Sequence, residues 1–406
     1  MRKSIRSILH KCRLIAIKVS NALCGLIKRD DNMILFTAWF GKKYIDSSRY
    51  MFEYCLQNTT YRVHWYVTSK ELFLELRNKG IPVVYSRSLK GLYIHVKSKM
   101  LVSSIQFSDF NPFLLKNSIL FDLGHGFRIK QGGFEQPDVT ERFKSYTMML
   151  RKYVKYYMAD SSEWLKSIAT RSFQLSEGQN VFCNKPRTDV LFDSKLREGK
   201  NEIVDKLKMG RKAIVYMPTH RSLGNVKMPM EELLDLPTIQ SICEDRNCVF
   251  LIKKHFYHRN ETENLEQYKN IFDITQEDID PEVLTYQADV MISDYSAAYI
   301  DFLLLNRPVI LYAYDLIDFL QCERDLYLKF DDNHVGYKPK TKEELNVAIK
   351  KVCTNWDDNE HLEGRLEIKR KYFDDDVPVG HAREDIVKIM GELISGTYSS
   401  KWRRKK

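Results

Sequence analysis

Several protein classes are excluded by what this sequence of 406 residues lacks. It has eight cysteines but no CxxC pair, and Cys243 and Cys248 have no second pair at zinc-ribbon spacing. Disulfide frameworks belong to small secreted chains, so we expect reduced, mostly buried thiols in a cytoplasmic protein, without a structural metal. Apolar stretches near the amino terminus are far shorter than the roughly 20 residues that span a bilayer, and no small-residue cleavage site follows them.

An excess of basic over acidic residues is also absent from most of the chain, although the net charge is +10. The first 30 residues carry eight basic residues and one acidic residue, and the last six carry five basic residues, which leaves residues 31–400 close to neutral. A nucleic-acid-binding protein usually carries its basic surface on the folded domain itself. The charge distribution therefore argues against nucleic acid as a partner.

The first 30 residues mix apolar and basic side chains in a pattern that an α-helix would largely separate onto two faces. One interpretation is a basic amphipathic helix that lies on the anionic cytoplasmic face of a membrane. The other is a helix that packs on the domain and keeps its charges in water. The basic tail at 401–406, with Trp402 as an interfacial anchor, favours the membrane.

The body of the chain has short apolar runs separated by helical stretches, which is the pattern of parallel sheets built from β-α-β units. We expect strands at 33–38, 63–67, 83–85, 100–103, 119–122, 156–159, 213–217, 249–252, 288–293 and 308–312. The pattern predicts an α/β protein of GT-B type, in which two Rossmann-like domains face a cleft. Ligands of such sheets bind beyond the carboxyl ends of the strands.

We expect four segments along the chain. They are a basic amphipathic membrane-associating segment at 1–30, a Rossmann-like domain at 31–195, a second one at 196–380, and a final helix with the basic tail at 381–406. Amphipathic helices are predicted at about 342–352 and 383–393, and we expect both to cross back and brace the first domain.

One candidate site follows the strand at 119–122, where Gly124, His125 and Gly126 form a turn. The flanking glycines permit tight backbone geometry, and a histidine at this place can accept a proton near neutral pH. Lys130 follows at a distance from which it can reach a phosphate group. The alternative is a histidine that only caps the turn.

A second candidate follows the strand at 288–293, where a helix is expected to begin near Ser296. The free N–H groups and the positive dipole end of such a helix bind phosphate, and the hydroxyls of Ser293 and Ser296 add donors. Asp294 and Ser296 can instead cap the helix. The two roles can coexist at one helix terminus.

Two further strands end on polar groups. The strand at 213–217 leads to Thr219 and Arg221, and the arginine can hold phosphate oxygens in bidentate fashion. The strand at 249–252 ends on two lysines and His255. Each signal is weak alone, but together the four strand ends indicate a ligand that contains phosphate.

Together these segments resemble the CDP-glycerol glycerophosphotransferase family, the polyol-phosphate primases and polymerases of teichoic-acid type. The resemblance covers roughly residues 34–390. It rests on 40–53 with Asp46, Gly124-His125-Gly126 with Lys130, Pro218-Thr219 with Arg221, His255, Ser293 to Ser296 with Asp301-Phe302, and Pro308 with 312–315.

The sequence departs from the family pattern in three places. Ala297 stands where a second serine is usual, Asn184 replaces the glycine of a glycine-x-proline-arginine-x-aspartate element, and Asp325 follows Arg324 where a glycine is usual. These changes leave the fold prediction intact and concern the identity of the polyol and the acceptor.

The resemblance implies that an acceptor hydroxyl attacks the β-phosphorus of CDP-glycerol or CDP-ribitol and that CMP leaves, in a reaction governed by positioning and charge neutralisation. It implies a glycopolymer or its lipid-linked precursor as acceptor, at the cytoplasmic face of the membrane, and no cofactor. It implies His125 as general base, with His255 as the second essential histidine. The substrate-binding residues are then Lys130, Thr219, Arg221, Ser293, Asp294 and Ser296.

Two other functions fit the sequence. A GT-B glycosyltransferase that uses a sugar nucleotide has the same fold, and a fold does not fix the chemistry. A non-catalytic membrane adaptor would work through its basic ends, but it would have no need of both His125 and His255. Trials with CDP-polyols and sugar nucleotides distinguish these functions.

Overall fold

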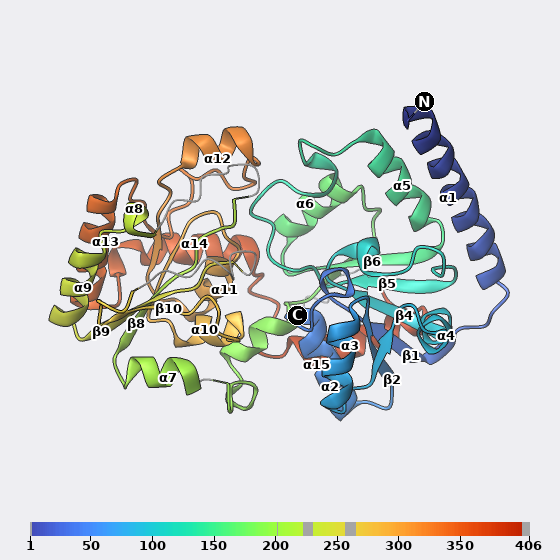
Figure 1. The fold of residues 1–406 in the computed structure, drawn as a ribbon, viewed down its shortest axis with the longest axis horizontal. Helices are drawn as coiled ribbons and strands as arrows, with labels where there is room; N and C mark the ends of the chain where they lie inside the picture. Colours follow the sequence, from blue (N-terminus) through green and yellow to red (C-terminus); the bar gives the residue numbers. More distant parts are fainter. Residues whose placement is uncertain (1, 201, 222–229, 256–264, 400–406) are drawn as a thin grey trace.

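Two parallel β-sheets form the centre of the protein in the computed structural model, which describes residues 2–200, 202–221, 230–255 and 265–399 (Figure 1). The strand order is β3-β2-β1-β4-β5-β6-β7 in the first sheet and β10-β9-β8-β11-β12-β13 in the second. In each sheet the first strand of the chain lies in the interior, and later strands are added towards both edges. This order places the connecting helices on both faces of the sheet. The predicted GT-B-like arrangement of two α/β domains is therefore confirmed.

The strands of the first sheet all lie between residues 30 and 182. They are β1 (Asp30–Phe36), β2 (Arg62–Val67), β3 (Val83–Tyr85), β4 (Ser98–Ser103), β5 (Ser118–Asp122), β6 (Val154–Asp160) and β7 (Asn180–Phe182). The second sheet contains β8 (Lys212–Tyr216), β9 (Cys248–Ile252), β10 (Ile271–Asp273), β11 (Val290–Ser293), β12 (Val309–Leu311) and β13 (Gly336–Tyr337). The central strands are buried on both faces, which explains their continuous apolar runs.

Several helices begin where serine, threonine or aspartate side chains accept hydrogen bonds from the first free N–H groups. Ser69, Ser88, Thr140, Ser162 and Thr341 cap helices in this way. The helices are α1 (Arg2–Cys24), α2 (Asp46–Asn58), α3 (Lys70–Asn78), α4 (Leu89–Lys97), α5 (Glu141–Arg151), α6 (Glu163–Phe173), α7 (Glu202–Lys208), α8 (Met230–Leu233), α9 (Leu236–Asp245), α10 (Pro281–Gln287), α11 (Ala298–Phe302), α12 (Leu316–Cys322), α13 (Lys342–Asn355), α14 (Leu362–Tyr372) and α15 (Ala382–Ser395).

The last helix returns to the first domain. Ile386, Met390 and Leu393 of α15 pack in the same core as the apolar residues of β1, β2 and β4. The prediction that the helix at 342–352 also braces the first domain is wrong. Residues of α13 such as Leu345 and Ile349 belong to the core of the second sheet, beside α9, because their apolar stripe faces that sheet.

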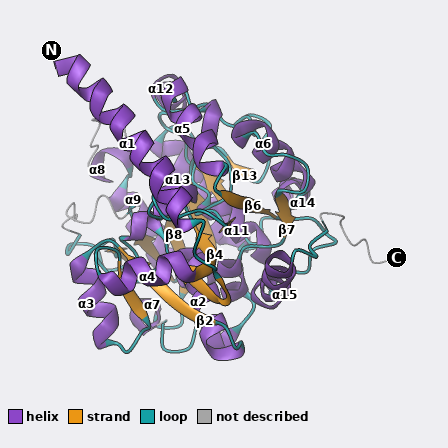
Figure 2. Cartoon of the chain, turned by 90° about the vertical axis from the view of Figure 1, so that its right-hand side faces the viewer, coloured by secondary structure: helices purple, strands orange, loops and turns teal. Residues whose placement is uncertain are grey.

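The amino-terminal helix α1 runs along the outside of the first domain, and its first turns extend beyond the body of the protein (Figure 2). Ile17, Asn21 and Cys24 anchor its second half, and the Asn21 side chain accepts the amides of Leu115 and Lys116, each at 2.9 Å. None of the described helices combines the length and apolar character needed to cross a bilayer. The basic tail at 401–406, with Trp402, lies outside the described residues.

Candidate functional site

A cleft of about 2260 Å³ lies between the two sheets and is lined by residues of both domains. It collects the loops that follow β5 in the first sheet and β8, β9 and β11 in the second. His125, Lys130, Thr219, His255 and Ser296 all line it. The structure therefore brings together five of the site residues predicted from the sequence, which lie up to 171 positions apart.

Ser293 lies behind the wall of the cleft. Its side chain is completely buried, and its hydroxyl donates a hydrogen bond to the carbonyl of Met217 at 2.8 Å. The prediction that Ser293 donates to phosphate is therefore wrong, because its only O–H donor joins the end of β11 to the end of β8.

Arg221 and Asp294 also lie behind the wall. The Nε and Nη2 groups of Arg221 donate to the two carboxylate oxygens of Asp315 at 2.8 and 2.9 Å, and Nη1 lies 2.8 Å from Asp294. Asp294 also accepts the amide of Thr219 at 2.9 Å. The bidentate grip predicted for phosphate is thus made to Asp315, and this network fixes the two loops that carry Thr219 and Ser296.

The turn that carries His125 is held by the strand before it. Gly124 has a left-handed backbone (φ +68°), and its N–H donates to the side chain of Asp122 at 3.0 Å. His125 Nδ1 lies 3.3 Å from the carbonyl of Ser104, and the Trp39 ring contacts the imidazole edge at 5.3 Å between centroids. A hydrogen bond to that carbonyl places the proton on Nδ1 and leaves Nε2 as a proton acceptor.

The protein around the cleft also shifts the pKa of the His125 imidazole. His125 is exposed to the cleft, yet the dense protein that surrounds it disfavours the charged form and lowers the pKa below its usual 6.5. The negative charge of Asp46 opposes this shift in part. His125 is therefore neutral at pH 7 and can accept a proton.

A buried arginine joins the two domains beneath His125. Arg187 donates from Nη2 to Asp301 at 2.7 Å and from Nη1 to the carbonyl of His125 at 3.1 Å. Its Nη1 lies 3.4 Å from Asp46, and its Nε lies 3.6 Å from Glu282. Because Asp301 and Glu282 come from the second domain, this cluster fixes the His125 turn relative to both domains.

The second domain approaches the His125 turn through the loop after β11. A Cβ atom on Gly126 would lie 3.4 Å from the Cβ of Ala297. The Ser296 hydroxyl accepts the amide of Ala298, the first residue of α11, at 3.2 Å. The start of α11 presents free N–H groups. Because α11 has only five residues, its helix dipole is weaker than that of the helix expected from the sequence.

Two cationic or titratable groups face each other across the same cleft. Lys130 follows the His125 turn, and burial lowers the pKa of its amine to about 8 while the charge of Asp294 opposes this shift. On the other side, the His255 ring stacks on that of His220, with 5.5 Å between centroids. The cleft therefore offers a ligand an amine from the first domain and imidazole groups from the second.

The sequence analysis gave no role to three polar residues that lie near the site, namely Asp46, Lys185 and Arg187. The sequence placed Asp46 and the segment 184–189 within the resemblance without giving them roles. Lys185 donates to the carbonyl of Leu123 at 2.8 Å, and burial lowers its pKa to about 8. The available signal was a cluster of charged residues around Pro186 between two apolar elements, since buried charges require partners.

Among the described residues, the groups with the spacing of metal ligands are Asp358, Glu360 and His361, which lie outside the cleft. Asp358 already pairs with Arg365 at 2.9 Å and with His361 at 2.8 Å. This cluster is an ion-paired turn and provides no group for the chemistry in the cleft.

The sequence pattern of the CDP-glycerol:poly(glycerophosphate) glycerophosphotransferase family matches residues 21–390. The chain is 25% identical over 385 residues to the teichoic acid poly(glycerol phosphate) polymerase of Bacillus spizizenii. This alignment covers 87% of this chain and 93% of that protein. It is 30% identical over 223 residues to the teichoic acid ribitol-phosphate polymerase TarL of Staphylococcus aureus, which covers 54% of this chain and 38% of TarL.

The fold also has a solved counterpart. The structure of the wall teichoic acid polymerase TagF superposes with a TM-score of 0.71 at 20% sequence identity, over 98% of each chain. At this identity the likeness supports the fold, while the family match rests on the sequence.

Proposed function

The chain belongs to the CDP-glycerol:poly(glycerophosphate) glycerophosphotransferase family, and we propose that its cleft moves a polyol phosphate from a CDP-activated donor to a hydroxyl of a cell-surface glycopolymer or its lipid-linked precursor. One observation carries this proposal. The turn with His125 on the first domain lies against the loop with Ser296 on the second, with Gly126 next to Ala297. A base and a phosphate-binding loop thus meet in one cleft.

The donor diphosphate binds between the two domains. Ser296, Thr219 and the free N–H groups at the start of α11 contact its oxygens from the second domain, and Lys130 does so from the first. His255 adds a further donor. Arg221 and Asp294 act as positioning residues for these loops, since their charged groups bind each other and Asp315.

The phosphoryl group passes directly from the donor to the acceptor, without a covalent enzyme intermediate. The acceptor hydroxyl oxygen attacks the β-phosphorus, and its proton passes to Nε2 of His125. The bond between the β-phosphorus and the oxygen that bridges to the α-phosphate breaks, and CMP leaves with that electron pair. Lys130, His255 and the N–H groups balance the charge on the transferring phosphoryl oxygens, which is the main requirement of such transfers.

The acceptor reaches the enzyme at a membrane surface. Helix α1 exposes Leu9, Ile15, Val19 and Leu23 to solvent while Ile17 faces the domain. Apolar residues exposed on a basic helix fit the interface of an anionic bilayer. We place the protein at the cytoplasmic face of the cell membrane as a peripheral enzyme, with CDP-glycerol or CDP-ribitol as donor.

A donor comparison tests the reaction. We expect CMP release from CDP-glycerol or CDP-ribitol when membranes supply the acceptor, and no turnover of UDP-sugars or CMP-sugars. Chromatographic detection of the released nucleotide measures each donor in parallel. Turnover of a sugar nucleotide alone would instead establish a GT-B glycosyltransferase.

The pH dependence of kcat/KM tests the two titrating groups. We expect a rise with pH whose midpoint lies below 6.5, as His125 loses its proton, and a fall centred near pH 8, as Lys130 loses the charge that binds phosphate. Lys130→Arg should remove the alkaline fall, because an arginine stays protonated. An alkaline limb unchanged in that variant would assign the fall to another group.

A further inference from the structure

The loop that follows β1 lies beside His125 in an unusual backbone conformation. Trp39, Phe40 and Gly41 all have positive φ angles, of 50°, 60° and 70°. Glycine adopts this region readily, whereas the two aromatic residues are strained in it. Such a conformation persists only where the surrounding structure holds it in place, so the groups that hold this loop are of interest.

One buried carboxylate holds the loop. Asp109 is 1% exposed, and its Oδ1 accepts the amide of Phe40 at 2.6 Å. Its Oδ2 accepts the amides of Ser104 and Ile105 at 2.8 and 2.7 Å. Burial raises the pKa of Asp109 to about 6 while these N–H groups oppose the shift, so the group is charged at pH 7. Asp109 therefore ties the loop after β1 to the loop after β4.

The two loops that Asp109 joins provide two sides of the His125 imidazole. The carbonyl of Ser104 lies 3.3 Å from Nδ1, and the Trp39 ring meets the imidazole edge at 5.3 Å between centroids. The amide of Trp39 also donates to the hydroxyl of Ser104 at 3.1 Å. Both contacts of the imidazole therefore come from backbone that depends on Asp109.

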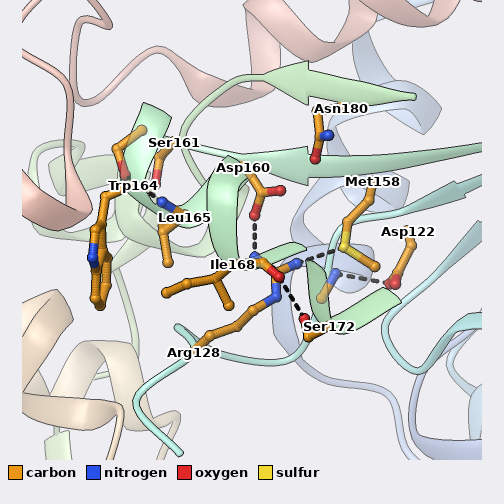
Figure 3. Close-up of polar contacts among 12 residues, drawn as sticks. Asp122, Arg128, Met158, Asp160, Ser161, Trp164, Leu165, Ile168, Ser172 and Asn180 are labelled. Atoms are coloured by element: carbon orange, nitrogen blue, oxygen red, sulfur yellow. Dashed lines mark hydrogen bonds and ion pairs between the residues drawn. The ribbon is translucent and has the colours of Figure 1, made fainter. Parts of the chain in front are cut away.

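The backbone of the turn that carries His125 is held by other groups. Asp122 accepts the amide of Gly124 at 3.0 Å at the beginning of the turn. Figure 3 shows the guanidinium of Arg128, just after the turn, pointing toward the buried carboxylate of Asp160, with which it forms an ion pair. Loss of Asp109 would thus leave the turn in place and release only the imidazole ring.

We propose that Asp109 is a positioning residue that sets the orientation and the tautomer of the His125 imidazole through Ser104 and Trp39. The inference rests on the proposed function, in which His125 takes the proton of the acceptor hydroxyl. With its own proton on Nδ1, the imidazole presents Nε2 to the cleft as an acceptor. If the Ser104 carbonyl moves away, nothing favours that tautomer, and the Nε2–H form cannot take the proton.

Asp109→Asn tests this role. Asparagine keeps the shape of the carboxylate, but its NH₂ group is a donor and cannot accept a hydrogen bond. Whichever way the amide turns, this group faces the N–H of Phe40 or those of Ser104 and Ile105. We expect kcat for CMP release to fall about 10- to 100-fold, because a displaced base slows proton transfer. The KM for CDP-glycerol should not change.

Asp289 supplies the matched control. Its carboxylate also accepts a backbone amide, that of Ala213 at 2.9 Å, but it does not line the cleft. Asp289→Asn should therefore lower thermal stability without lowering kcat, and thermal unfolding verifies that both variants are folded in the assay. A fall in kcat as large as that of Asp109→Asn would indicate general destabilisation and overturn the proposal.

Trp39→Leu is a second variant, which leaves the hydrogen bonds of Asp109 in place. It removes the indole beside the imidazole but not the carbonyl of Ser104. We expect a smaller fall in kcat than in Asp109→Asn and no change of tautomer. An unchanged kcat would overturn the part of the proposal that concerns Trp39.

Nitrogen NMR of protein labelled in its histidines reads the tautomer without any substrate. The signals of His125 are those that disappear in His125→Ala. At neutral pH we expect the Nδ1–H form in the wild type and the Nε2–H form in Asp109→Asn. An Nε2–H form in the wild type would overturn the proposal even if the Asp109 variant does not fold, and so would the same tautomer in both proteins.

The outcomes separate this proposal from the proposed function. The expected change of tautomer without CMP release from any donor would leave the role of Asp109 intact and overturn the proposed reaction. Normal CMP release by Asp109→Asn would overturn the role of Asp109 and leave the proposed reaction intact.

Discussion

Replacement of His125 by alanine should lower the rate of CMP release by about 10²–10⁴-fold, the usual contribution of a general base. The imidazole is neutral at pH 7, lines the cleft and has Nδ1 held by the carbonyl of Ser104. No other described side chain on this turn between Asp122 and Phe127 can accept the proton at neutral pH. Steady-state assays with saturating CDP-glycerol and membrane acceptor measure the loss in kcat.

The affinity for the donor should change little in this variant, because Ser296, Thr219 and Lys130 remain. CMP binding by calorimetry checks this directly. His381→Ala is the control, since His381 is an exposed histidine outside the cleft that contacts Glu384. A His125→Ala protein that retains full kcat would show that the acceptor proton goes elsewhere.

Replacement of Arg187 by methionine should destabilise the protein by about 3–5 kcal/mol, the range found when one partner of a buried ion pair is removed. The substitution leaves Asp301 and Asp46 without their cation and removes the hydrogen bond to the carbonyl of His125. Denaturant unfolding measures the loss of stability, and kcat should fall as the His125 turn loses its support.

The destabilisation caused by Arg187→Met should become smaller at lower pH. Burial already raises the pKa of Asp301, and Arg187 opposes this shift. Without the arginine this pKa rises further, so the carboxyl group takes up a proton on acidification and the unpaired charge disappears. The control is Arg62→Met, because Arg62 forms an exposed pair with Asp30 that contributes less than about 1 kcal/mol. Equal destabilisation by both substitutions would contradict the buried-cluster interpretation.

The sequence predicted the sheets well where strands are buried on both faces. Runs such as those of β8 and β9 are continuous, apolar and bounded by polar residues, which is the pattern of a central parallel strand. The strands β7, β10 and β13 were missed. They lie at sheet edges and contain only two or three residues, among them Asn180, Asp273 and Gly336. The equally short edge strand β3 was predicted because all three of its residues, Val-Val-Tyr, favour strands.

The site was predictable where its chemistry is local. His125 and Ser296 follow predicted strands, and the carboxyl ends of strands are where such folds bind ligands. The partners of buried side chains were not predictable. Arg221 meets Asp315 and Arg187 meets Asp301 across 94 and 114 positions of the chain, and only the packed structure shows which charges neutralise each other.

Ser293 and Ser296 illustrate the same limit at close range. Both are hydroxyl residues in one motif, but Ser293 ends a buried strand and Ser296 lies in the loop between β11 and α11. A shift of three positions changes a residue from an internal hydrogen-bond donor into one that lines the cleft. Burial, which depends on the rest of the fold, decides between these roles.

The return of α15 to the first sheet affects how the protein is made. The core beneath β1, β2 and β4 is closed by a helix that begins about 200 residues after β7 ends. At synthesis rates of about 5–20 residues per second, the ribosome takes roughly 10–40 s to produce that interval. The first domain therefore waits with an uncovered apolar face until nearly the whole second domain has emerged, and the two halves mature together.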